Sequence, residues 1–446
     1  MTTAPALAGA AEVTHGRVLR IALPIVLSNA TVPLLGAVDT AVVGQMGMAA
    51  PIGAVGVGAI ILASVYWIFG FLRMGTSGLA AQAHGAGDWP ERDAVLHRAL
   101  MIGAAAGLVF VLVQGPLVWA ACGMAPASAE VEGLARQYLS IRIWGAPATI
   151  ALYAVTGWLI ALERTRAVFA LQIWQNGVNI GLDLWFVLGL GWGVPGVAVA
   201  TLIAEWSGLA LGLWFCRAAF AGQVAGAWAR VWDAARLRRM AGVNTDIMIR
   251  SVLLQGSFTA FVFLGAGLGD VTLAANQVLL QFIEVAAYAL DGFAFAAEAL
   301  VGQAVGARSV AGLRRGAWLS SLWALAGTVL MCGAFALFGP AIIDVMTTSA
   351  EVRSEARIYL PWLVAAPLVG LAAWMLDGVF IGATRTAEMR RAMLVSVAVY
   401  ALALAWLLPT YGSHGLWAAL MVLNTMRALT LGAMWPTVIR AAERGH

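Results

Sequence analysis

Oxygen-bearing side chains recur at helical spacing inside otherwise apolar parts of this sequence. Asn176, Asn179 and Asp183 follow one another at intervals of three and four residues, which places them on one face of a helix. Thr201 and Glu205 are likewise one turn apart. A charged side chain in the centre of a bilayer costs roughly 2.5–3.5 kcal/mol even on the insertion scale, so such residues are candidates for function. Carboxylate, amide and hydroxyl oxygens bind Na⁺, and a carboxylate also binds H⁺, so the pattern predicts a cation site. Hydrogen bonding between helices is the structural alternative.

Asp39 supplies a second carboxylate, on an apolar stretch that contains Pro24 and Pro33. Pro33 cannot donate to the carbonyl of Asn29, so a bend is predicted there. Ser28 precedes Asp39 by about three helical turns and faces the same way. Two carboxylates close together in a low-dielectric region favour binding of one shared cation, and they titrate as a unit. Gain or loss of that cation would change the local charge by one and could drive a conformational change.

Further ionisable residues fall within the apolar stretches and form a second, less specific group. Asp291 and Glu298 are seven residues apart on one helical face, and Arg73 occupies the corresponding stretch of the first half. An ion pair with Arg73 and a role in substrate binding are both open interpretations. Arg142 and Arg427 are interpreted as ion-pair or interfacial residues. The candidates for an additional polar or substrate site are Asn176, Glu205, Asp291, Glu298, Asp377 and Arg73.

The helices that must position these residues follow from composition. Of the 446 residues, 62% are hydrophobic and 11% are charged, whereas soluble domains average roughly 45–50% and about 25%. A transmembrane helix needs about 20 apolar residues, so we expect an all-α polytopic membrane protein with twelve transmembrane helices. The predicted segments are 19–44, 52–83, 95–121, 135–161, 167–190, 194–217, 244–268, 272–305, 314–339, 354–383, 391–410 and 413–436.

The charged residues set the predicted topology. All 26 basic residues are arginine, and the absence of lysine excludes a phosphate-binding loop of the usual type. Twenty arginines, including Arg250 in the predicted central linker, fall in connections on one side, and three fall on the other. The positive-inside rule then places both termini in the cytoplasm. We expect the chain to lie in the inner (cytoplasmic) membrane.

The two halves of the sequence resemble each other at an offset of about 221 residues. The stretch around Gln82 and Gly85 parallels that around Gln303 and Gly306, and Ile160-Ala-Leu-Glu-Arg-Thr parallels Ile381-Gly-Ala-Thr-Arg-Thr. Because six spans return the chain to the same side, the repeats are predicted to be parallel, forming two pseudo-symmetric six-helix lobes around a central cavity. The predicted divisions are a cytoplasmic tail at 1–16, lobes at 17–217 and 244–436, a cytoplasmic linker at 218–243 and a cytoplasmic tail at 437–446.

Several motifs are similar to those of the multidrug and toxic compound extrusion (MATE) family, in particular its DinF-like branch. They are Ile21-Ala-Leu-Pro-Ile with the stretch from Asn29 to Thr40, Leu72-Arg-Met-Gly-Thr-Ser-Gly, Ala287 to Glu298, and Leu376-Asp-Gly-Val-Phe-Ile-Gly-Ala-Thr-Arg385. The resemblance, from about residue 17 to 440, implies an exporter that takes up H⁺ or Na⁺ and releases cationic or lipophilic drugs or toxic metabolites by alternating access. It also implies that Asp39, Asn179, Asp183 and Thr201 form the cation-coupling site, including any Na⁺ site. A second site, which other branches build from acids on the seventh and tenth helices, would retain only Asp377.

Other functions remain open at this stage. A lipid-linked precursor flippase of the same superfamily would place several arginines in its cavity, and a permease subunit would need a separate energising partner. An intramembrane enzyme would need a nucleophile with its base or a histidine-rich metal cluster, which the spans do not show, so we expect no enzyme. The expected partners are small lipophilic or cationic molecules and the lipid bilayer. We expect a monomer, no cofactor beyond H⁺ or Na⁺, and no nucleic acid.

Overall fold

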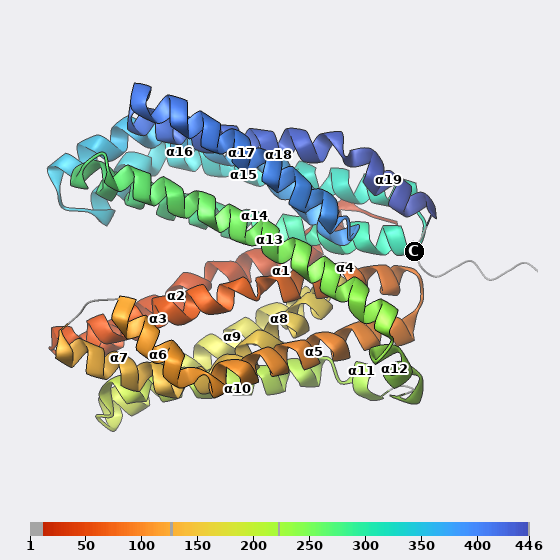
Figure 1. Ribbon diagram of the computed structural model, residues 1–446, viewed down its shortest axis with the longest axis horizontal. Coiled ribbons are helices and arrows are strands. Elements are labelled where there is room, and N and C mark those ends of the chain that lie inside the picture. The colour runs from red at the N-terminus through yellow and green to blue at the C-terminus, as the bar shows by residue number, and fades with distance from the viewer. Residues whose placement is uncertain (1–11, 125–127, 222–223, 445–446) are drawn as a thin grey trace, which may run out of the picture. The chain divides into compact units, whose positions relative to one another are not determined.

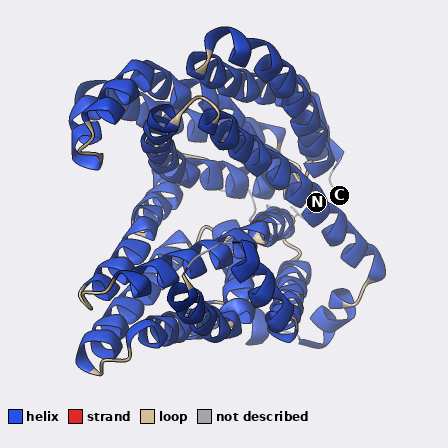
Figure 2. Ribbon diagram, turned by 60° about the vertical axis from the view of Figure 1, so that its left-hand side comes forward, coloured by secondary structure: helices blue, strands red, loops and turns tan. Residues whose placement is uncertain are grey.

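The computed structural model describes residues 12–124, 128–221 and 224–444, so most of the predicted tail at 1–16 lies outside it. Within these ranges the chain is helical almost throughout, and no strand occurs in them (Figure 2). An α-helix satisfies its backbone N–H and C=O groups internally, and the hydrocarbon core of a membrane offers them no other partners. The expectation of an all-α fold is therefore confirmed.

The first half of the chain forms a run of helices that includes one 3₁₀ turn and one π-helical turn (Figure 1). These elements are α1 (His15–Ala30), α2 (Val32–Gly44), α3 (Ala49–Ile68), α4 (Gly70–Gly85), α5 (Trp89–Leu112), α6 (Gln114–Met124), α7 (Ala129–Arg142), the 3₁₀ turn η1 (Ile143–Gly145), α8 (Ala146–Ala161), α9 (Thr165–Asp183), the π-helical turn η2 (Leu184–Gly189) and α10 (Gly193–Phe215).

Two short helices join the halves, and the second half contains longer, less interrupted helices. They are α11 (Ala218–Ala221), α12 (Val224–Val231), α13 (Ala234–Ala266), α14 (Asp270–Gly306), α15 (Val310–Met346), α16 (Ala350–Gly382), α17 (Thr386–Tyr411), α18 (Ser413–Ala433) and α19 (Trp435–Arg444).

Ten helical segments in the described ranges are long and apolar enough to cross a membrane. The other two predicted spans are also helical but differ in character. The first is interrupted at Thr31, between α1 and α2, and the fifth changes from α9 to the π-helical turn η2 directly after Asp183. The two atypical spans are therefore the ones that carry Asp39 and Asp183.

Backbone torsion angles support the internal repeat independently of the sequence match. Residues with positive φ recur at the same offset: Glu163 (57°) and Thr384 (50°) end the fourth and tenth predicted spans. Gly87 (70°) matches Arg308 (55°), and Gly191 (69°) matches Gly412 (56°), in the same way. Non-glycine residues rarely adopt this conformation, so its recurrence at matched turns indicates one backbone design used twice.

Packing divides the chain into two compact units. The amino-terminal unit contains Leu27–Ala80 and Asp88–Met240, and the carboxyl-terminal unit contains Ala81–Gly87 with the described parts of Met1–Val26 and Ala241–His446. In the carboxyl-terminal unit a buried hydrophobic cluster joins α13 and α18. It includes Phe261 and Trp417, whose ring centroids lie 5.1 Å apart.

Two glycines allow a close helix crossing inside the carboxyl-terminal unit. A Cβ on Gly85 would lie 1.9 Å from the carbonyl oxygen of Gln303, and a Cβ on Gly306 would lie 2.0 Å from that of Gln82. Only glycine permits backbones to approach so closely. The contacts are reciprocal and involve the two copies of the repeated sequence motif, so α4 and α14 cross through matched positions.

The connection after α10 is attached to the amino-terminal unit rather than extended away from it. Arg230 on α12 binds the carboxylate of Asp88 with oxygen distances of 2.5 and 2.7 Å, and Arg236 pairs with Glu91 on α5. One assignment from the sequence was wrong: Arg250 is not in the cytoplasmic linker, because it lies within α13 and is 8% exposed.

Candidate functional site

Two carboxylates from different helices meet inside the amino-terminal unit. Asp39 on α2 is 8% exposed, Asp183 at the end of α9 is fully buried, and their side chains are close enough for the two carboxylates to influence each other. Two ionised carboxylates repel each other at this separation, so a shared proton or a metal cation stabilises the pair. The position of Asp183 is set where α9 gives way to a π-helical turn, a feature frequent at functional sites.

Asn179 and Thr201 add oxygen atoms beside this pair of helices. The Asn179 amide donates to Thr201 Oγ1 at 3.0 Å, and the Thr201 hydroxyl donates to the carbonyl of Val197 at 3.0 Å. These bonds fix the orientation of the Asn179 amide, and its oxygen accepts no hydrogen bond from the part of the chain that the structure describes. Asp39 Oδ1, Asn179 Oδ1 and both oxygens of Asp183 are buried and accept from no N–H or O–H donor among the described residues, the contact between the two acids apart.

Both polar atoms of the Asn176 side chain are engaged in hydrogen bonds within the protein. Its carbonyl accepts a hydrogen bond from Gln172 at 2.9 Å, and its amide donates to the carbonyl of Thr31 at 3.4 Å. Thr31 is the residue at which α1 and α2 are interrupted, and its own hydroxyl donates to the carbonyl of Ser28. Asn176 thus ties α9 to the interruption beside Asp39.

Glu205 is engaged in a buried ion pair. Arg142, the last residue of α7, donates to Glu205 Oε2 on α10 at 2.6 Å. A Cβ at position 145 would lie 2.0 Å from that same oxygen, so Gly145 is needed for the pair to fit. The ion-pair interpretation of Arg142 agrees with this contact, and one carboxylate oxygen of Glu205 is engaged in it.

The sequence reasoning did not place Arg142 and Tyr138 near the aspartates, or Tyr66 near Arg142. The guanidinium of Arg142 acts electrostatically on Asp39 and Asp183, and the Tyr138 side chain lies within electrostatic range of Arg142 and Asp39. Tyr138 is 2% exposed and Tyr66 5% exposed. A basic residue in mid-span was the available signal, because a buried charge in a membrane protein requires a nearby countercharge.

The carboxyl-terminal unit contains a cluster of opposite sign. Asp377 on α16 pairs through Oδ2 with Arg250 on α13, and the same oxygen accepts from Arg427 on α18 at 2.5 Å. Arg427 also donates to Asn424 at 3.0 Å. All three charged residues are at least nine-tenths buried. Asp377 therefore lies between two guanidinium groups.

The remaining candidates are placed as follows. Glu298 on α14 is 1% exposed and Asp291, two turns earlier, is partly buried, while Arg73 on α4 is buried in the amino-terminal unit. The backbone carbonyl of Arg73 lies 2.3 Å from the Cβ that Gly157 lacks, so α4 and α8 cross closely at this point. No group of three or more His, Cys, Asp or Glu side chains suited to a metal ion occurs within 12–124, 128–221 and 224–444.

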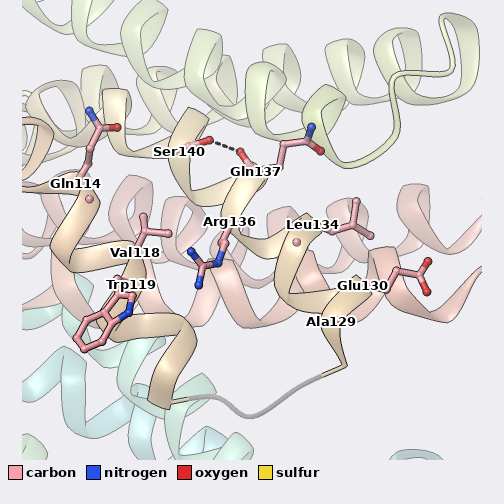
Figure 3. A pocket seen from close by; sticks show the side chains of 11 residues that line it. Gln114, Val118, Trp119, Ala129, Glu130, Leu134, Arg136, Gln137 and Ser140 are labelled. Carbon is pink, nitrogen blue, oxygen red and sulfur yellow. Dashed lines mark hydrogen bonds between the residues drawn. The ribbon is translucent and has the colours of Figure 1, made fainter.

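A surface cavity of about 780 Å³ lies between α6 and α7, away from the aspartates in the chain (Figure 3). Arg136 points from α7 toward α6, where Trp119 and Val118 line the opposite wall, and Glu130 lies at the other end. Its lining does not include Asp39, Asn179, Asp183 or Thr201. The predicted cation-site residues are thus brought together in a buried interior position and not in this cavity.

Comparison with known proteins identifies the family. The MatE family model matches twice, at residues 24–185 and 247–407. The chain is 40% identical over 422 residues to the DNA damage-inducible protein F of Escherichia coli K12, covering 93% of this chain and 90% of that protein. It is 27% identical over 459 residues to the probable multidrug resistance protein NorM of Pseudomonas aeruginosa, covering 94% and 89%.

Solved structures show the same fold at low sequence identity. The Vibrio cholerae MATE transporter VcmN in its bent form superposes with a TM-score of 0.85 at 19% identity, covering 96% of this chain and 97% of that one. An outward-facing multidrug resistance MATE transporter of the MOP superfamily gives 0.83 at 18% identity, with the same coverage. The two matches of the family model coincide with the two repeats, and the DinF-like resemblance is confirmed. The chain belongs to the MatE family and is a polytopic membrane transporter, not an enzyme.

Proposed function

We propose that this protein exports small lipophilic or cationic molecules in exchange for H⁺ or Na⁺, which binds at Asp39, Asn179, Asp183 and Thr201. The names of its relatives, among them multidrug resistance proteins, support export of toxic compounds. The exchange needs no cofactor other than the coupling ion.

The observation that carries the proposal is the set of buried oxygens without donors. Asp39 Oδ1, Asn179 Oδ1 and both oxygens of Asp183 face a region from which protein donors are missing among the described residues. Burying a polar group without a partner costs roughly 1–3 kcal/mol, and more for a charged group. A proton or Na⁺ held by these oxygens removes that cost, which makes the bound ion an integral part of one conformation.

Binding of the ion would be coupled to conformation through α2 and α9. Arg142 is held by Glu205 at 2.6 Å and is therefore not available to neutralise the two aspartates fully. Loss of the ion leaves two like charges in contact, which favours movement of one helix relative to the other. The interruption at Thr31 and the π-helical turn after Asp183 are places where these helices can bend.

The transport cycle that we propose is alternating access by two lobes, residues 17–217 and 244–436, joined by the linker at 218–243. In this proposal the chain lies in the inner membrane with both termini in the cytoplasm, an orientation supported by the concentration of arginines in the connections on one side. The protein would act as a monomer, taking its substrates from the cytoplasm or the bilayer.

Efflux from proteoliposomes tests this proposal. Wild-type protein, Asp39→Asn and Asp183→Asn are reconstituted with rhodamine 6G inside, and a pH gradient or a Na⁺ gradient is imposed separately. Both substitutions remove a charge with little change in volume, so gradient-driven efflux should fall to the rate of protein-free vesicles. Glu132→Gln is the matched control, since Glu132 is 38% exposed in its pair with Arg136 on the same unit.

The gradient that drives wild-type efflux identifies the coupling ion. Efflux that follows the pH gradient and ignores Na⁺ assigns the site to H⁺, and the reverse assigns it to Na⁺. Unchanged gradient-driven efflux in Asp39→Asn would refute the assignment of the site.

A further inference from the structure

We propose that Arg250 and Arg427 in the carboxyl-terminal unit form a binding site for a carboxylate carried by the exported molecule. This inference rests on the transport function proposed above and names the part of the substrate that the second half recognises. Its occupant is a lipophilic zwitterion, which carries a cationic group together with the carboxylate.

The first support is the number of donors in this cluster that are unused. A guanidinium group has five N–H donors. In the structure Arg250 donates to Asp377 alone, and Arg427 donates to Asp377 and to Asn424. Arg250 Nε is buried and has no acceptor in the structure, although the side chain is only 9% exposed. Most of the donors of both groups therefore remain available to a planar oxyanion.

The cluster of Arg250, Arg427 and Asp377 also carries a net positive charge. Asp377 balances one of the two guanidinium groups, and both are bonded to its Oδ2 atom. One positive charge of this cluster is left over in a membrane-spanning unit, where an uncompensated charge costs several kcal/mol. Asp246, the acid that lies one turn before Arg250 on α13, is engaged with Arg390 at 2.5 Å and with Thr386 at 3.1 Å. A ligand carboxylate would supply the missing charge.

Geometry favours a carboxylate as the ligand group. The planar fork of an arginine matches the two oxygens of a carboxylate and forms two parallel hydrogen bonds with it. Arg250 donates to Asp377 through Nη2, and its Nε has a hydrogen left to donate to such a group. A cationic ligand would meet two like charges here, so the cluster selects against the charge that the amino-terminal site attracts.

Binding of two dyes to purified protein in detergent tests the proposal. Rhodamine B carries a carboxylate, and its ethyl ester is the same molecule without that negative charge. Fluorescence anisotropy gives a dissociation constant for each dye. For the wild-type protein we expect rhodamine B to bind more tightly than the ester. Arg250→Gln should weaken rhodamine B about tenfold or more, as expected for loss of a charge-assisted hydrogen bond, and leave the ester unchanged.

A second substitution acts in the opposite direction. Asp377→Asn removes the internal carboxylate and releases both guanidinium groups, so rhodamine B should bind several-fold more tightly relative to the ester. A structural role alone would weaken both dyes alike in both variants. Arg357→Gln, which removes an exposed ion pair with Asp344 in the same unit, is the control and should leave both dissociation constants as in the wild type.

Two results would overturn the inference. One is a ratio of the rhodamine B dissociation constant to that of the ester that is the same in Asp377→Asn as in the wild type. The other is loss of rhodamine B binding when phosphatidylglycerol is added, which would assign the guanidinium groups to a lipid headgroup. Dye binding is measured without a gradient, so its outcome does not depend on whether the proposed antiport is correct. Asp39→Asn can abolish efflux while the preference for rhodamine B persists.

Discussion

The two halves of this transporter place an ion pair between the same two helices with the charges exchanged. In the first half Arg142 on the fourth span binds Glu205 on the sixth, and in the second half Asp377 on the tenth span binds Arg427 on the twelfth. Arg142 and Asp377 are 235 positions apart and do not match in the repeat, whereas Glu205 and Arg427 are 222 positions apart, close to the offset of the repeat. The backbone design is repeated while the sign of the charge at this position is reversed.

The surroundings of the two pairs extend this difference. Asp39 and Asp183 lie near the first pair and add negative charge, whereas Arg250 lies on the second and adds positive charge. The two halves thus share the positions at which their helices cross, but they differ in the charged groups buried near those positions. Helix packing depends on shape and small residues, and these can be kept while single buried charges change.

The largest effect is expected from breaking the first pair. Arg142→Gln leaves Glu205 buried without its cation, which costs about 3–5 kcal/mol. Thermal unfolding of the purified variant, followed by tryptophan fluorescence, should show a much lower midpoint. The double variant Arg142→Gln/Glu205→Gln should recover most of the loss. A double variant no more stable than the single one would contradict this account.

A smaller effect is expected from the matching change in the second half. Arg427→Gln leaves Asp377 paired with Arg250 and also removes the surplus positive charge, so the loss should not exceed about 1.5–3 kcal/mol, the value of a hydrogen bond to a charged group. The same unfolding assay compares it directly with Arg142→Gln. Equal losses in the two variants would show that Arg250 does not neutralise Asp377.

The two halves should respond alike where their backbones match. Gly85→Ala and Gly306→Ala each place a Cβ within about 2 Å of a carbonyl oxygen on the other helix, so each should lower stability by about 1–3 kcal/mol through overpacking. Unfolding midpoints that differ strongly between these variants would argue against a symmetric crossing.

The smallest effect is expected at the interruption of the first span. Asn176→Ala removes the hydrogen bonds to Thr31 and Gln172 and should cost about 0.5–1.5 kcal/mol. Hydrogen exchange measured by mass spectrometry should show faster exchange in the peptide around Thr31 and unchanged exchange in α18. Equal exchange around Thr31 in the two proteins would remove Asn176 from this role.

Much of the fold could be read from local pattern. Apolar runs of bilayer length predict helices because hydrocarbon leaves the backbone no other way to satisfy its hydrogen bonds. The stripe from Asn176 to Asp183 follows from helical periodicity, and the structure indeed brings Asn179 beside Thr201 and Asp183 beside Asp39. The part that failed was Arg250, since its proximity to the basic linker made a buried position in α13 look cytoplasmic.

The sequence by itself determined that this chain is helical, crosses a membrane many times and contains one design twice, because those properties depend on composition and spacing along the chain. Only the tertiary structure decided which charges face each other. Glu205 proved to be bound to Arg142, and Asp377 proved to lie between two arginines. The energy of a buried charge depends on the groups within a few ångströms of it, and those groups come from helices that are far apart in sequence.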